Sequence, residues 1–140
     1  DVFINNAGIS GYGNEPSEVL MTNSDAAVDL MFRFYSKMTK GDINNIGSVA
    51  SHLSGHGQSM GRASYILSKR NIEQASDMLN QVREKPVNVC FLSPGMIATD
   101  IAQETKKREP MLPQDVIDCI EWILSVPSHL KITKMEIDNR

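Results

Sequence analysis

Short apolar segments alternate with longer amphipathic segments along almost the whole chain. Four short segments are predicted to be strands. Residues 2–4 and 87–92 are apolar runs with polar flanks, residues 43–46 have moderate β-propensity, and residues 132–137 alternate between apolar and polar side chains. Between them, apolar residues recur at helical spacing in three segments: residues 26–38, 63–84 and 113–124. Such alternation is typical of a parallel sheet with helices on its faces. The sequence therefore predicts an α/β fold with a doubly wound parallel sheet.

The predicted strand order also locates a candidate binding site. Right-handed crossovers bring the carboxyl ends of parallel strands to one edge of the sheet, where ligands of α/β proteins bind. Three segments follow directly after predicted strands: residues 5–8, 48–51 and 93–99. Residues 9–18 are predicted to be a loop, and residues 99–110 a mobile polar stretch.

Composition limits the class of protein. The 140 residues suit a single domain, residues 1–140. The net charge of -3 gives no electrostatic reason to expect nucleic acid or an anionic membrane as a partner, and no apolar run approaches the ~20 residues that span a bilayer. Cys90 and Cys119 lie in apolar segments, which favours a reduced, cytoplasmic protein. Because the chain starts in a strand-like run without Met, we expect that its N-terminal strands are missing.

Tyr65 and Lys69 are the first candidates for chemistry. They are four residues apart on a predicted helix, so their side chains share a face. A tyrosine has a pKa of about 10, and a nearby ammonium group lowers that pKa by favouring the phenolate. Such a tyrosine can exchange a proton with an alcohol or a carbonyl. From spacing alone, solvent exposure or a cation–π contact is the commoner explanation of the pair.

Four motifs follow one another along the chain: Asn5-Asn6-Ala7-Gly8, Asn45-Ile46-Gly47-Ser48, Tyr65-Ile66-Leu67-Ser68-Lys69 and Ser93-Pro94-Gly95-Met96-Ile97-Ala98-Thr99-Asp100. Together they resemble the catalytic, C-terminal portion of the short-chain dehydrogenase/reductase family. Each lies after a predicted strand or on the predicted second helix. The resemblance covers nearly the whole chain. It implies a Rossmann-like fold and an NAD(P)-dependent oxidoreductase that interconverts an alcohol and a carbonyl on a small substrate.

The resemblance implies catalytic roles for four residues. Tyr65 would be the general acid in reduction and the general base in oxidation. Lys69 would lower the tyrosine pKa and bind the nicotinamide ribose, and Ser48 would hold the substrate oxygen where charge develops. Asn23 resembles the family's fourth catalytic residue, which anchors a water in a proton relay to the lysine. A helix N-cap explains Asn23 equally well.

The implied cofactor is NAD or NADP, with NADP favoured, and its nicotinamide carries the hydride. Besides Tyr65 and Lys69, the resemblance assigns seven residues to the cofactor: Asn5, Ala7, Gly8, Pro94, Gly95, Ile97 and Thr99. Without the other motifs, Pro94-Gly95 would indicate a plain turn.

The chain also departs from the family pattern. The stretch from Ser48 to Tyr65 is longer than usual, which makes Ser51 a rival for the role of Ser48, and the stretch from Gly8 to Asn23 is short. The family's Gly-rich phosphate-binding turn does not occur, nor does the charged residue that selects NAD or NADP.

These departures leave two hypotheses. The chain is catalytic, or it is a degenerate relative that serves as an oligomerisation or interaction module. Little activity is expected from the 140 residues alone. Because the family pairs its two long helices between subunits, a homodimer or homotetramer is expected. No metal site is expected, since His52 and His56 have no Cys or carboxylate near them in the sequence.

Overall fold

The computed structural model describes residues 1–53, 59–82, 84–99 and 109–139. One sheet of four parallel strands has the order β1-β2-β3-β4, with β1 at Val2–Asn5, β2 at Gly41–Ile46, β3 at Val87–Pro94 and β4 at Lys134–Ile137. The longer helices are α2 (Ala27–Lys37), α3 (Met60–Gln81) and α4 (Pro113–Ser125). The α/β class and the parallel sheet are confirmed.

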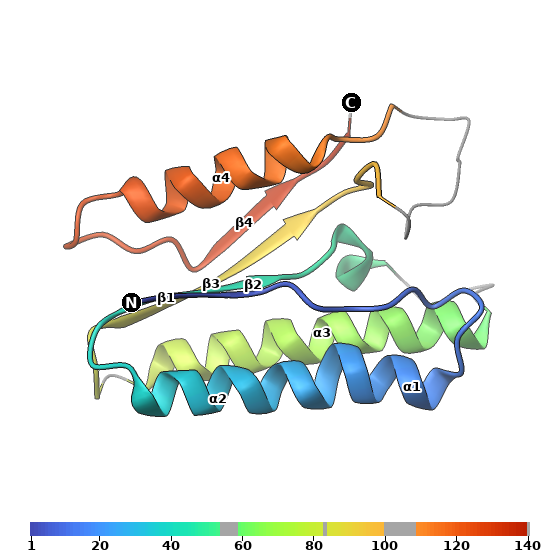
Figure 1. Cartoon of the computed structure of the whole chain (residues 1–140), viewed down its shortest axis with the longest axis horizontal. Coiled ribbons are helices and arrows are strands. Elements are labelled where there is room, and N and C mark those ends of the chain that lie inside the picture. The colour runs from blue at the N-terminus through green and yellow to red at the C-terminus, as the bar shows by residue number, and fades with distance from the viewer. Residues whose placement is uncertain (54–58, 83, 100–108, 140) are drawn as a thin grey trace.

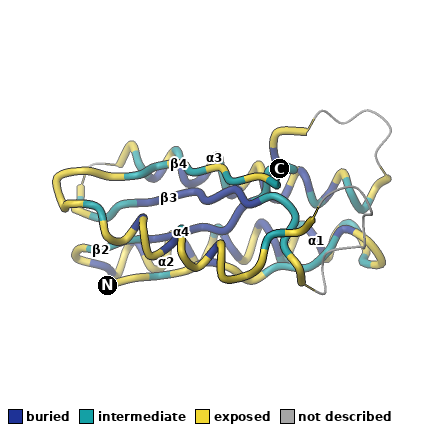
Figure 2. Tube along the Cα trace, turned by 90° about the horizontal axis from the view of Figure 1, so that it is seen from above, coloured by how far each residue is buried: buried dark blue, intermediate teal, exposed yellow. Residues whose placement is uncertain are grey.

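Helices cover both faces of the sheet (Figure 1). On one face, α2 and α3 pack on a core that contains Ile43 and Val89. On the other, α4 packs on Cys90 and Leu92. Successive residues of β3 therefore point to opposite faces, and Figure 2 shows that most of this strand is buried. The sheet is doubly wound, as the sequence predicted.

The last crossover differs from the expectation of uniformly right-handed connections. The connections β1 to β2 and β2 to β3 run through the helices of one face, whereas β3 to β4 runs through α4 on the opposite face. Because the four strands follow one another in one direction, moving the helix to the other face reverses the hand of the crossover. The expectation is wrong for this connection. All four carboxyl ends still meet at one edge, since every strand pair is parallel.

The first helical segment begins earlier than the sequence predicted. It consists of α1 (Pro16–Leu20), a π-helical segment η1 (Met21–Ala26) and α2 without interruption. Pro16 suits the first turn because its missing N–H has no helical partner there. The helical spacing of apolar residues did not reveal η1, because the buried positions of this segment hold the polar residues Asn23 and Ser24. The loop predicted at residues 9–18 is therefore wrong from Pro16 onward.

Helix α3 is shifted by one turn from the predicted 63–84. Ser59 caps it by accepting a hydrogen bond from the backbone N–H of Arg62 at 3.2 Å, and the extended backbone of Val82 ends it. Its first turn holds the exposed Met60 and the half-buried Gly61, which do not continue the apolar spacing of the helix. In the same way, β4 starts at Lys134 rather than residue 132.

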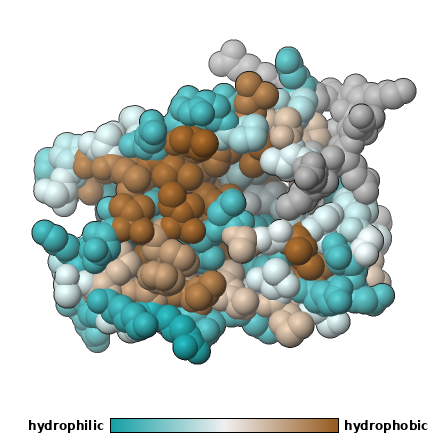
Figure 3. Space-filling view, viewed as in Figure 1, coloured by the Kyte–Doolittle hydropathy of each residue, from teal (hydrophilic) through white to brown (hydrophobic). Residues whose placement is uncertain are grey.

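Apolar side chains gather between α4 and β1 on one face of the molecule (Figure 3). There α4 packs over β3, β4 and the end of β2 and leaves β1 uncovered, so Val2 and Ile4 are 55% and 46% exposed. Within the described ranges, no helix combines the length and apolar character needed to cross a membrane.

Candidate active site

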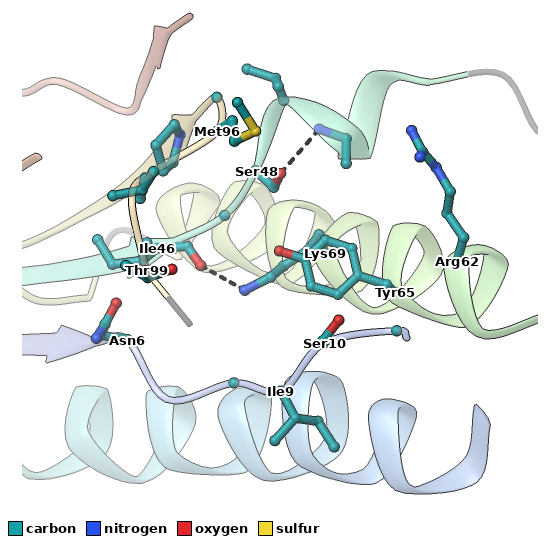
Figure 4. Close-up of a pocket in the computed structure, with 18 of the residues that line it drawn as sticks. Asn6, Ile9, Ser10, Ile46, Ser48, Arg62, Tyr65, Lys69, Met96 and Thr99 are labelled. Carbon is teal, nitrogen blue, oxygen red and sulfur yellow. Dashed lines mark hydrogen bonds between the residues drawn. The ribbon is translucent and has the colours of Figure 1, made fainter. Parts of the chain in front are cut away.

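A cavity of about 560 Å³ lies at the carboxyl edge of the sheet. It is formed by the loops after β1, β2 and β3 together with the first turns of α3 (Figure 4). The structure brings nine of the residues predicted for the site to its wall: Ala7, Gly8, Ser48, Tyr65, Lys69, Pro94, Gly95, Ile97 and Thr99.

Helix α3 presents Tyr65 and Lys69 to this cavity from successive turns. The Lys69 Nζ lies 5.7 Å from the centre of the Tyr65 ring, within cation–π range. The cation–π contact considered from the sequence is thus present, but Lys69 is only 5% exposed, so the pair is not a solvated surface pair. Tyr65 and Lys69 therefore make the cation–π contact and also line the cavity.

The ammonium group of Lys69 is held in place by the end of β2. Its Nζ donates to the carbonyl oxygen of Ile46 at 3.1 Å. Burial disfavours the charged form and lowers the pKa of Lys69 to about 8. Lys69 therefore remains mainly protonated at neutral pH but loses its charge in mildly alkaline solution.

The pKa of Tyr65 is raised above its usual value of 10.0, chiefly because burial penalises the phenolate. A hydrogen bond with the side chain of Ser48 acts in the opposite direction and lowers it. The net direction of the pKa differs from the lowering that the sequence predicted, because the effect of burial exceeds that of the Ser48 hydrogen bond. At neutral pH the phenol keeps its proton, which suits a proton donor.

Ser48, and not Ser51, faces the cavity. It ends the loop after β2 and caps a short 3₁₀ helix, η2 (Val49–His52), where its Oγ accepts from the N–H of Ala50 at 3.1 Å. Ser51 is 3% exposed, does not line the cavity, and its Oγ has no hydrogen-bond partner among the described residues. The geometry favours Ser48 as the serine that contacts a ligand.

Asn23 lies behind the cavity wall, in the π-helical segment. Its Oδ1 accepts from the N–H of Ile9 at 2.7 Å, and its Nδ2 donates to the carbonyl of Ile9 at 2.8 Å. A Cβ on Gly8 would lie 3.3 Å from the Asn23 Oδ1 and 3.7 Å from the Lys69 Nζ, so all three are neighbours. The N-cap interpretation is wrong, because the helix begins a full turn or more earlier, at Pro16.

Asn5 does not reach the cavity. Its Nδ2 donates to the carbonyl of Ala27 at 2.9 Å and to the Oδ1 of Asn45 at 3.0 Å, on the face covered by α2. Asn6 lines the cavity instead. The strand alternation contained this signal, because the apolar Phe3 shares a face with Asn5 and packs on the helical core.

Two further residues of the site, Arg62 and Tyr12, were not predicted from the sequence. Both line the cavity, and the Arg62 Nη1 donates to the Tyr12 hydroxyl at 3.1 Å. Arg62 precedes Tyr65 by three residues, so helical spacing could have placed both on one face.

Of the two histidines considered for metal binding, only His52 lies among the described residues. His52 is exposed, and its Nε2 lies 3.3 Å from the Oε2 of Glu136. His56 lies outside the described residues, as do Asp100 and the basic run at 106–108.

Comparison with protein families gives one match. A family model for short chain dehydrogenases matches residues 1–110. No curated protein matches the chain.

Solved structures match nearly the whole chain. The structure of 4-hydroxyisoleucine dehydrogenase complexed with NADH and succinate is 25% identical with a TM-score of 0.77, covering 99% of this chain and 66% of that chain. Serine dehydrogenase from Escherichia coli is 23% identical with a TM-score of 0.70, covering 98% and 62%. BdcA in complex with NADPH is 19% identical with a TM-score of 0.81, covering 99% and 64%. The chain thus spans 62–66% of the length of these three chains.

Proposed function

The chain belongs to the short-chain dehydrogenase family, and on that premise we propose that, as a single domain, it interconverts an alcohol and a carbonyl on a small substrate with NAD or NADP. The observation that carries the proposal is the convergence of Tyr65, Ser48 and Lys69 on one cavity at the carboxyl edge of the sheet. In this arrangement the Tyr65 phenol can donate a proton to a substrate oxygen. The Ser48 hydroxyl can donate a hydrogen bond to the same oxygen, and the Lys69 ammonium supplies a positive charge nearby.

Tyr65 moves the proton in this proposal. In reduction, its phenolic proton goes to the carbonyl oxygen as the carbonyl carbon accepts a hydride. In oxidation, the alcohol gives its O–H proton to the phenolate and its C–H hydride to the oxidised cofactor. Ser48 donates a hydrogen bond to the same oxygen, where negative charge grows along the reaction. A bound nicotinamide would supply or accept the hydride.

The residues at the cavity fit a nicotinamide cofactor. The Lys69 ammonium has three N–H donors, and the carbonyl of Ile46 takes one of them. The remaining donors could hold ribose hydroxyls. The cavity volume lies within the range of small-molecule sites, about 300–1,000 Å³. Gly8 and Gly95 on its wall present backbone without side chains. Similar chains have been solved with NADH and with NADPH, so the proposal covers both cofactors.

Asn23 would position this machinery. Both polar ends of its side chain are used by Ile9, so a water in a relay to Lys69 would need another acceptor. A π-helical turn displaces the normal helical hydrogen bonds, and such turns occur often at functional sites. We infer that the backbone carbonyl of Asn23 would take that water, while its side chain holds the loop.

The test compares Tyr65→Phe with the wild type in the intact protein. Loss of turnover with cofactor binding retained is expected, because the proton donor is lost and the ring stays. Ser48→Ala and Ser51→Ala form a matched pair, in which only the first should lower kcat. Unchanged turnover in Tyr65→Phe would rule out the proposed role.

A non-catalytic interaction module is the alternative, and the exposed apolar side chains between α4 and β1 are the observation that favours it. Titration of the chain with NADPH separates the two functions. If NADPH binds and Lys69→Met weakens that binding, the enzyme is supported. If the intact protein does not bind NADPH, the interaction module is supported.

A further inference from the structure

The cavity has a second cationic group at the end away from the residues expected to hold the cofactor. Figure 4 shows Asn6 and Thr99 at one end, Ser48 and Tyr65 in the middle, and Arg62 at the other end. Tyr12, in the loop after β1, contacts Arg62 at this end. A substrate with its reacting carbon beside Tyr65 would extend toward Arg62.

The charge of this wall is positive. Among the described residues that line the cavity, Lys69 and Arg62 are charged, and no Asp or Glu is present. No ion pair of Arg62 occurs among the described residues, although the whole chain has a net charge of -3. An arginine stays protonated at any working pH. The guanidinium of Arg62, on the wall of the cavity, therefore lacks a compensating negative charge within the described protein.

Arg62 is also held in a defined place. A Cβ on Gly11 would collide with the carbonyl of Gly61, and one on Gly61 with the carbonyl of Gly11, so the two backbones touch. This contact fixes the first turn of α3 against the loop that carries Tyr12. The hydrogen bond from the Arg62 Nη1 to the Tyr12 hydroxyl then orients the guanidinium. Its Nε and Nη2 donate to no acceptor among the described residues. A fixed guanidinium with free donors matches the planar, two-oxygen geometry of a carboxylate.

Resting on the proposed function, we propose that Arg62, oriented by Tyr12, binds a carboxylate of the substrate, so that the natural substrates are hydroxy acids and the corresponding oxo acids. The chemistry balances as for any alcohol: the carbinol loses a hydride to the oxidised cofactor and a proton to the Tyr65 phenolate, which becomes the phenol, while the carboxylate is unchanged. Three residues of helix rise by about 4.5 Å, so the carboxylate stands several bonds from the reacting carbon.

The experiment uses the intact protein and three secondary alcohols with different spacing, 3-hydroxybutanoate, 4-hydroxypentanoate and 5-hydroxyhexanoate, each beside its methyl ester. The wild type should prefer at least one acid over its ester in kcat/KM. Arg62→Gln should reduce that preference roughly 10- to 100-fold, mostly through KM. The substitution removes the charge-assisted pair between the guanidinium and the carboxylate, whereas the proton transfer at Tyr65 is unchanged. Arg33→Gln removes the same charge from an exposed site on α2 and should leave the preference unchanged.

The outcomes separate this proposal from the proposed function. Turnover of acids and esters with equal kcat/KM, or an Arg62→Gln variant that keeps the preference, overturns the carboxylate site and leaves the oxidoreductase intact. If no alcohol is turned over, calorimetric titration with each acid and ester still decides the point. Tighter binding of an acid that is lost in Arg62→Gln supports the site, and equal binding of acid and ester overturns it.

Discussion

The side chain of Asn23 holds the backbone of Ile9 at two points, accepting from its N–H at 2.7 Å and donating to its carbonyl at 2.8 Å. The pair joins the π-helical segment to the loop after β1. Because Gly8 lies between Asn23 and the ammonium of Lys69, the same pair sets the distance of this loop from Lys69.

Asn23→Ala should therefore destabilise the protein by about 2 kcal/mol, since it leaves both backbone polar groups of Ile9 without their part-buried partners. Denaturant unfolding measures the loss. Asn14→Ala is the control: Asn14 lies in the same loop, and its Nδ2 donates to the carbonyl of Ser10 at 3.0 Å in a more exposed setting. Equal losses in the two variants would contradict the role of Asn23.

Gly61→Ala should destabilise the protein although alanine is the better helix former. At an ordinary helical position this change would stabilise by about 1 kcal/mol. Here the added Cβ would collide with the backbone of Gly11, which cannot move without carrying the loop with it. Thermal unfolding gives the sign, and a higher Tm than wild type would refute the contact. Ala63→Gly is the control. Ala63 is exposed in the same turn, so its replacement measures only the difference in helix propensity between alanine and glycine.

The stability of the protein should depend on pH through Lys69. Burial lowers its pKa from 10.5 to about 8, so between these values the unfolded chain binds the proton and the folded chain does not. Stability from this group thus rises with pH across that window, by up to about 3 kcal/mol. We expect the stability gap between Lys69→Met and wild type to shift in favour of wild type from pH 8 to pH 10.5. Parallel pH profiles for the two proteins would contradict the buried, perturbed ammonium.

The strand–helix alternation and the ordered motifs were enough to predict the sheet, its parallel strands and most of the cavity wall. The carboxyl ends of parallel strands meet at one edge, so Ser48 and Pro94 follow from local sequence once their strands are recognised. The start of α1 and the true place of Asn23 did not follow, since η1 buries polar side chains whose partners lie across the chain. The place of Tyr12 did not follow for a similar reason, because its contact with Arg62 joins residues fifty positions apart.

Two adjacent asparagines in β2 should respond to the same substitution with opposite signs. Asn44 points to the α4 face, is fully buried, and neither its Oδ1 nor its Nδ2 has a partner among the described residues. Asn45 points to the α2 and α3 face, where its Nδ2 donates to Ser76 at 2.9 Å and its Oδ1 accepts from Asn5 at 3.0 Å.

Asn44→Val should stabilise the protein by about 1–3 kcal/mol, because it removes a desolvated amide that gains nothing in return, and valine suits a buried strand. Asn45→Val should destabilise it by a similar amount, since Asn5 and Ser76 would lose a buried partner. Equilibrium unfolding of both variants tests the pair, and each serves as the control for the volume and β-propensity of the other. Destabilisation in both would show that the Asn44 amide is satisfied in solution.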